Sequence, residues 1–119
     1  MVILQGRSRA LAERLNQPGE TLHAPHLLDL EIAHAVRREV LRGLITADEG
    51  GLAFARLAEL SVTRYPHTQF LERIWQLRNN VTAYDAAYVA LSEVLDAPLI
   101  TRDRRLGNAA GHRARIEVF

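Results

Sequence analysis

The chain has 119 residues, 48% hydrophobic and 24% charged, so it is long enough for one globular domain with its own core. It has no cysteine, which excludes a disulfide framework, a zinc–thiolate site and cysteine catalysis. The chain has 15 basic residues, all of them Arg, and 14 acidic residues, which give a net charge of +1. The total charge therefore gives no sign of a nucleic-acid partner. No apolar run reaches the roughly 18 residues of a membrane span, and no signal peptide is recognisable, so we expect a cytoplasmic protein.

Helical and extended patterns alternate along the chain. An apolar stub at residues 2–4 is followed by a short amphipathic pattern that predicts a helix over 9–15. Leu28, Ile32, Val36 and Val40 recur every four residues and predict the longest helix, 26–44. Thr46 and Glu49 form a capping-box pattern that opens the next helix. Further helices are expected over 68–79 and 83–95, and a turn or short helix over 104–111.

Four short runs predict strands, near residues 21–24, 61–65, 98–101 and 116–119. Strands that alternate with helices indicate an α/β fold with a parallel sheet and helices on both faces. Ligands in such sheets bind beyond the carboxyl ends of the strands. We therefore expect functional side chains just after Ala24, Tyr65 and Thr101.

Three carboxylates stand where surface charge is not expected. Glu31 lies at the edge of the apolar stripe of the long helix, and Asp85 lies one turn into a nearly all-apolar helix. Asp103 follows the strand 98–101 by two residues. Each also has an ordinary alternative: Glu31 reaches solvent or pairs with Arg38, Asp85 completes a capping box with Thr82, and Asp103 caps the segment at Arg104.

Together the three acids are more informative, because carboxylates gathered in a half-buried cleft repel one another and need a cation. Hard oxygen ligands favour Mg²⁺ or Mn²⁺, and such ions activate water for phosphodiester hydrolysis. A di-iron site built on Glu31 and His34 is disfavoured because that site needs two helical copies of the pattern. Arginines flank the acids and would suit a phosphate backbone, although ordinary solvated charge is the alternative; they are Arg38, Arg102, Arg104 and Arg105.

Two segments carry a resemblance to a known family. APHLLDLEIAHAVRR (24–38) and TAYDAAYVALSEVLDAPLITRDRRL (82–106) resemble PIN-domain proteins, most of all VapC toxins of bacterial toxin–antitoxin pairs. The resemblance implies a three-layer sandwich that cleaves RNA with Mg²⁺ or Mn²⁺ held by Glu31, Asp85 and Asp103. It also implies a homodimer and a VapB-type antitoxin partner, and it suggests that Thr101 orders the site by hydrogen bonding.

The chain departs from the family at its start. PIN domains begin with a central strand that ends in an acid, whereas this chain has no acid before Glu13. Residues 1–5 look similar to the end of the helix that follows that strand, which predicts a single PIN-like domain over 1–119 without its first strand. A start assigned too far downstream or a cut chain is one explanation, and a real short form is the other. We favour the first, because a sheet without its central strand exposes two unpaired edges.

The leading hypothesis is therefore a Mg²⁺-dependent endoribonuclease toxin of a VapBC-type pair, whose full activity is in question because the first acid is absent. The alternative is a catalytically impaired PIN-like module that binds an antitoxin or RNA without cutting it.

Overall fold

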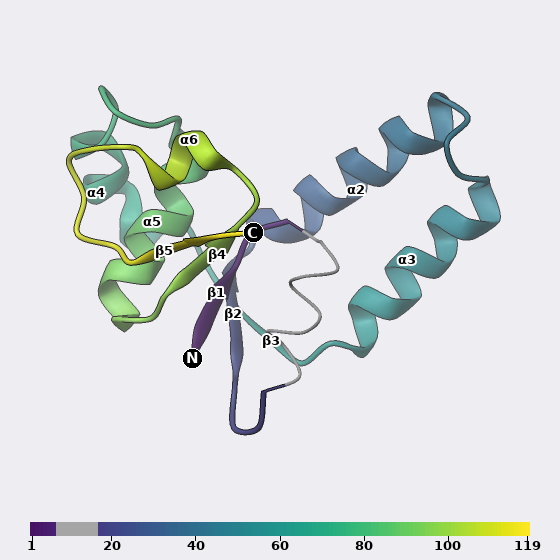
Figure 1. The fold of residues 1–119 in the computed structure, drawn as a ribbon, viewed down its shortest axis with the longest axis horizontal. Helices are drawn as coiled ribbons and strands as arrows, with labels where there is room; N and C mark the ends of the chain where they lie inside the picture. Colours follow the sequence, from purple (N-terminus) through teal and green to yellow (C-terminus); the bar gives the residue numbers. More distant parts are fainter. Residues whose placement is uncertain (7–16) are drawn as a thin grey trace.

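The computed structural model describes residues 1–6 and 17–119, so the helix predicted over 9–15 lies outside the described residues. Five parallel strands form one sheet in the order β3-β2-β1-β4-β5 (Figure 1). The strands are β1 (Val2–Leu4), β2 (Leu22–Pro25), β3 (Val62–Tyr65), β4 (Leu99–Thr101) and β5 (Ile116–Val118). The helices are α2 (Leu27–Leu41), α3 (Ala47–Glu59), η1 (Thr68–Phe70), α4 (Leu71–Gln76), α5 (Ala83–Leu95) and α6 (Arg104–Gly107).

The parallel α/β architecture and all four predicted strands are confirmed. The expectation that the central strand is missing is wrong, since Val2–Leu4 pairs with β2 on one side and β4 on the other. Its three residues are fully or almost fully buried. A central parallel strand is covered on both faces and reads as a continuous apolar run, and three residues are too few for periodicity to separate strand from helix.

Alternation along β1 divides the core between the two faces of the sheet. Val2 and Leu4 pack in a cluster with Leu28 and Ile32 of α2. Ile3 points the other way, into a cluster built on α5. Successive side chains of a strand point to opposite faces, so this short strand joins the two helical layers.

Helices α2 and α3 form a hairpin that projects away from the sheet (Figure 1). The predicted capping box is confirmed: Thr46 Oγ1 accepts from the Glu49 backbone N–H and the Glu49 carboxylate accepts from the Thr46 N–H, both at 3.1 Å. Gly50 allows the close approach of the two helices, because a Cβ there would lie 3.1 Å from side-chain atoms of Val36 and Val40.

The other helical layer consists of η1, α4, α5 and α6 (Figure 1). The predicted single helix over 68–79 is divided into η1 and α4, which ends at Gln76, and residues 77–82 connect α4 to α5. Trp75, expected on its apolar face, is 68% exposed. Helix α5 is buried over most of its surface, as its sequence indicates. No helix in the described ranges is long and apolar enough to cross a bilayer.

Candidate functional site

Glu31, Asp85 and Asp103 come together at one cavity of about 400 Å³, although they belong to α2, α5 and the turn after β4. We call it the acidic cavity. It lies where β1 and β4 end, the edge at which open parallel sheets place ligands. Its lining consists of Gln5, Gly6, Glu31, Ile32, Ala35, Glu39, Asp85, Thr101, Arg102 and Asp103.

Glu31 is partly buried, and its surroundings shift the pKa of its carboxyl. Burial raises the pKa of its carboxyl, and the nearby Asp85 charge adds to the rise. A hydrogen bond from the buried Tyr88 hydroxyl to Glu31 Oε1, 2.5 Å long, opposes that rise. Burial and the same hydrogen bond raise the pKa of Tyr88, so its hydroxyl keeps its proton and acts as the donor. The contact fixes the Glu31 carboxylate at the cavity wall.

Gln5 lines the acidic cavity and connects Asp85 to Thr101. Its Nε2 donates to Asp85 Oδ1 at 2.9 Å, and its Oε1 accepts from the Thr101 hydroxyl at 2.7 Å. Thr101 Oγ1 in turn accepts from the Asp103 backbone N–H at 3.0 Å. The buried Thr101 thus connects the strand end to two acid positions. Gln5 stands at the carboxyl end of the central strand, where the family resemblance implies an acid.

The ordinary alternative for Asp103 is confirmed alongside its place in the cavity. For Asp85 only half of the expected capping box forms, because Thr82 caps the helix while the Asp85 carboxylate accepts from Gln5. Asp103 is the N-cap of α6, and its Oδ1 accepts from the Arg105 backbone N–H at 2.9 Å. Thr82 caps α5 and accepts from the Asp85 N–H at 3.1 Å. Capping fixes where each carboxylate stands, so it does not compete with a role in the cavity. Glu31 accepts from Tyr88 rather than pairing with Arg38 as one alternative expected.

The predicted arginines are distributed around this site. Arg102 lines the acidic cavity, while Arg38 and Glu31 line a neighbouring cavity between α2 and Tyr84. Arg105 lines a third cavity, of about 450 Å³, together with residues 78–82, Asp85, Asp103 and Leu106. Arg104 is exposed on α6.

The carboxylates are hard oxygen donors of the kind that Mg²⁺ and Mn²⁺ prefer. The repulsion between Asp85 and Glu31 also favours a cation. The donor chemistry therefore fits a divalent ion. Even so, in residues 1–6 and 17–119 no group of three or more His, Asp or Glu side chains is close enough to hold a metal ion.

Sequence reasoning missed Gln5 and Tyr88. Tyr88 follows Asp85 by three residues, so both lie on one face of α5, and this spacing was the available signal. Gln5 was hidden because the stub before it was interpreted as the end of a helix. The Arg78–Thr82 connection, which lines the third cavity, carried no recognisable motif.

A sequence profile of the PIN domain matches residues 3–112. The chain belongs to the PIN-domain family. This PIN domain is 42% identical to "Ribonuclease VapC9" of Mycobacterium tuberculosis, with 98% of each chain covered. It is 46% identical to "Ribonuclease VapC12" of the same species, over 92% of this chain and 83% of the other.

Among solved structures, the PIN domain resembles "Crystal Structure of PAE2754 from Pyrobaculum aerophilum" with a TM-score of 0.68. The alignment covers 88% of this chain and 81% of that chain at 23% sequence identity. At that identity the similarity establishes the fold.

Proposed function

We propose that this PIN domain is an endoribonuclease toxin of the VapC type, which hydrolyses RNA phosphodiesters. One observation carries the proposal: Glu31, Asp85 and Asp103, from three separate elements, line one cavity at the carboxyl edge of the parallel sheet. The ribonuclease names of relatives with 42% and 46% identity support it.

Glu31, Asp85 and Asp103 would hold Mg²⁺ or Mn²⁺ together with water molecules, since the three carboxylates are not close enough to surround an ion by themselves. When bound, such an ion supplies positive charge for the developing phosphorane and lowers the pKa of a bound water. Tyr88 orients Glu31, and the Gln5–Thr101 chain of hydrogen bonds orients Asp85 and the turn that carries Asp103. Arg102 would contact the RNA backbone beside the reacting phosphate, with Arg38, Arg104 and Arg105 further along it.

The VapC relationship implies a VapB-type antitoxin as the protein partner. We further propose that the active form is a homodimer and that it acts in the cytoplasm, where its RNA substrate is.

The test is cleavage of single-stranded RNA by the purified chain with Mg²⁺, compared with EDTA and with Asp85→Asn. Asp96→Asn is the matched control: it makes the same chemical change at the opposite end of α5, at an exposed position. Asn tolerates the left-handed backbone of residue 96 (φ 48°). We expect EDTA and Asp85→Asn to abolish cleavage and Asp96→Asn to retain it. Cleavage that persists in both EDTA and Asp85→Asn would exclude this mechanism.

A second candidate, a module that binds antitoxin or RNA without cleaving, is favoured by Gln5. A neutral amide stands at the end of the central strand and already satisfies Asp85 and Thr101. Under this alternative the wild-type chain binds RNA or the antitoxin but shows no Mg²⁺-dependent cleavage beyond that of Asp85→Asn.

A further inference from the structure

The third cavity, of about 450 Å³, lies between the α4–α5 connection and α6. We call it the arginine cavity, after Arg78 and Arg105 in its wall. It shares Asp85 and Asp103 with the acidic cavity, so the two cavities meet at this pair of carboxylates. Anything that occupies the arginine cavity is therefore adjacent to the proposed cleavage site.

Arg78 is held in place but not neutralised. Its Nη1 donates to the Trp75 carbonyl at 2.9 Å, and its guanidinium carbon lies 4.6 Å from the Trp75 ring centroid. Within the described part of the chain its guanidinium forms no ion pair with a carboxylate, in contrast to the Arg64–Asp29 and Arg73–Glu93 pairs. A fixed guanidinium with unpaired donors is suited to a phosphate oxygen.

Trp75 adds an aromatic surface to this arginine. The side chain is the only Trp of the chain and is 68% exposed, although burial is the usual state of so large an apolar group. Proteins that bind single-stranded RNA stack its bases on aromatic rings and on Arg planes. The Trp75–Arg78 stack offers both surfaces beside the cavity.

Arg105 supplies the second cation of the cavity. Its side chain is 95% exposed, and its Nε lies 3.7 Å from Asp103 Oδ1. That separation is too long for a hydrogen bond, so its donors remain available to a second acceptor. The exposed pair is weak and can be exchanged for a phosphate contact without a large loss of stability.

We propose that the arginine cavity is the subsite for the nucleotide next to the cleaved bond of single-stranded RNA. Arg78 and Arg105 contact its phosphate, and the Trp75–Arg78 stack carries a base. The assignment rests on the proposed function in taking RNA as the ligand, but it concerns binding rather than cleavage.

The experiment titrates the wild-type chain with a short single-stranded RNA oligonucleotide in EDTA, so that no metal-dependent cleavage interferes. Because Trp75 is the sole Trp, intrinsic tryptophan fluorescence reports on this place alone. We expect saturable quenching, with the same dissociation constant as fluorescence anisotropy of the labelled RNA.

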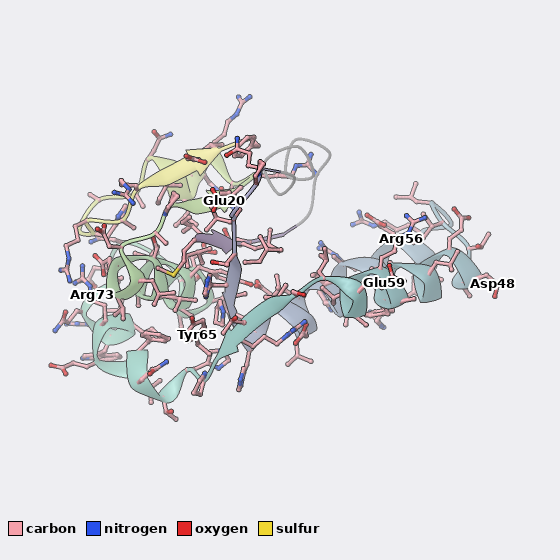
Figure 2. The ribbon with its side chains drawn as sticks, turned by 90° about the horizontal axis from the view of Figure 1, so that it is seen from below. Glu20, Asp48, Arg56, Glu59, Tyr65 and Arg73 are labelled. Atoms are coloured by element: carbon pink, nitrogen blue, oxygen red, sulfur yellow. The ribbon has the colours of Figure 1, made fainter. Side chains whose placement is uncertain are left out.

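Arg78→Gln is expected to weaken binding about tenfold and to reduce the slope of log K against log salt by about 0.7, the value for one lost phosphate contact on a single strand. Arg56→Gln is the matched control, because Arg56 is an exposed arginine on the projecting hairpin, far from the α4 region (Figure 2). It should change affinity less than twofold. Arg78→Lys, which keeps the charge but lacks the planar group, should give an intermediate affinity, and thermal melts followed by circular dichroism check that each variant folds.

Equal RNA affinity for Arg78→Gln and Arg56→Gln would overturn the proposal, as would unchanged Trp75 fluorescence at saturating RNA. Quenching by an antitoxin peptide but not by RNA would assign the surface to a protein and also overturn it. The proposed function is tested separately. Quenching of Trp75 by RNA without Mg²⁺-dependent cleavage would support this subsite and reject the nuclease. Mg²⁺-dependent cleavage without these effects on binding would support the nuclease and reject this subsite.

Discussion

Arg73 and Glu93 form a two-bond ion pair that joins α4 to α5, with Nε–Oε1 and Nη2–Oε2 distances of 2.7 and 2.9 Å. The Glu93 side chain is 1% exposed and also accepts from the Arg113 backbone N–H at 2.9 Å. Arg73 Nη2 donates in addition to the Gly111 carbonyl at 3.1 Å. The pair therefore fastens α4 to the C-terminal end of α5, and it also anchors the loop before β5.

Glu93→Gln is expected to reduce the free energy of unfolding by about 3 kcal/mol, because it leaves the Arg73 charge without its buried partner. The exposed Glu72→Gln on α4 is the control and should change it by less than about 0.5 kcal/mol. Urea denaturation at pH 7 measures both. A Glu93→Gln loss no larger than that of Glu72→Gln would mean that the pair does not stabilise the fold.

The same pair predicts a pH dependence. The Arg73 hydrogen bonds hold the pKa of Glu93 below its ordinary value of 4.5, although burial opposes the shift. The unfolded chain therefore takes up the proton first as pH falls, so the stabilisation is complete above the ordinary pKa and is lost as pH drops through the lower, folded one. The stability gap between wild type and Glu93→Gln should be constant from neutral pH down to about the ordinary pKa and should narrow as the pH falls from there toward the lower, folded pKa. A gap that widens on acidification would contradict the assignment.

Tyr88→Phe tests whether the orientation of Glu31 matters for the metal. Loss of the hydroxyl removes the donor to Glu31 while the ring stays buried, so we expect the Mg²⁺ concentration for half-maximal cleavage to rise about tenfold. Tyr84→Phe is the control on the same helix, where the ring is 64% exposed. Mn²⁺ titration followed by calorimetry gives a readout apart from activity. Identical metal dependence in the two variants would show that Tyr88 serves packing alone.

Gln5→Glu places a second carboxylate 2.9 Å from Asp85 Oδ1, where the amide now donates. In EDTA we expect the free energy of unfolding to fall by about 1 to 3 kcal/mol, because the substitution removes a hydrogen-bond donor and adds a like charge. Mn²⁺ should restore much of that stability, because a bound cation would offset the added negative charge. Gln69→Glu, at an exposed position on η1, should respond to neither condition. Destabilisation that Mn²⁺ leaves unchanged would argue against a cation at this place.

Gly111→Ala probes the loop that supports the arginine cavity. A Cβ there would lie 2.0 Å from Nδ2 of Asn80, and the backbone has φ 86°. Gly19→Ala is the matched control, with φ 81° and no atom within 4 Å of the new Cβ. In both variants the left-handed backbone should lower the free energy of unfolding by about 1 kcal/mol. Gly111→Ala should lower it further, because Asn80 must move to make room for the new Cβ. Equal unfolding free energies would show that Asn80 moves freely.

Much of the fold follows from local pattern. The strands at 22–25, 62–65, 99–101 and 116–118 were predicted to within one residue, because turn-forming residues or helix patterns bound each apolar run. The strand at 2–4 was not, since three apolar residues carry no period. The division of the predicted helix 68–79 into η1 and a shorter α4 was also not predicted. The apolar Trp75 looked like a core residue and so extended the helical pattern, whereas its side chain is exposed in the structure.

Of the residues that line the acidic cavity, the sequence marked the three acids and Arg102, and the family resemblance added Thr101. Asp103 follows a strand, and Glu31 and Asp85 interrupt apolar faces, so their positions in the sequence marked them. Gln5 and Tyr88 are joined to those acids across 80 and 57 positions of sequence, and hydrogen bonds of that span depend on the packing of the whole sheet. The spacing of residues along the sequence therefore does not predict such partners.

Because Asp85 and Asp103 line both cavities, we expect ligands bound in the two cavities to affect each other's affinity. A cation in the acidic cavity would cancel the carboxylate repulsion felt by a phosphate in the arginine cavity, and a phosphate there would in turn tighten the cation by the same factor. The chain would then respond to metal and RNA as a cooperative pair of ligands, each weak alone. The RNA substrate itself would then help to recruit the ion.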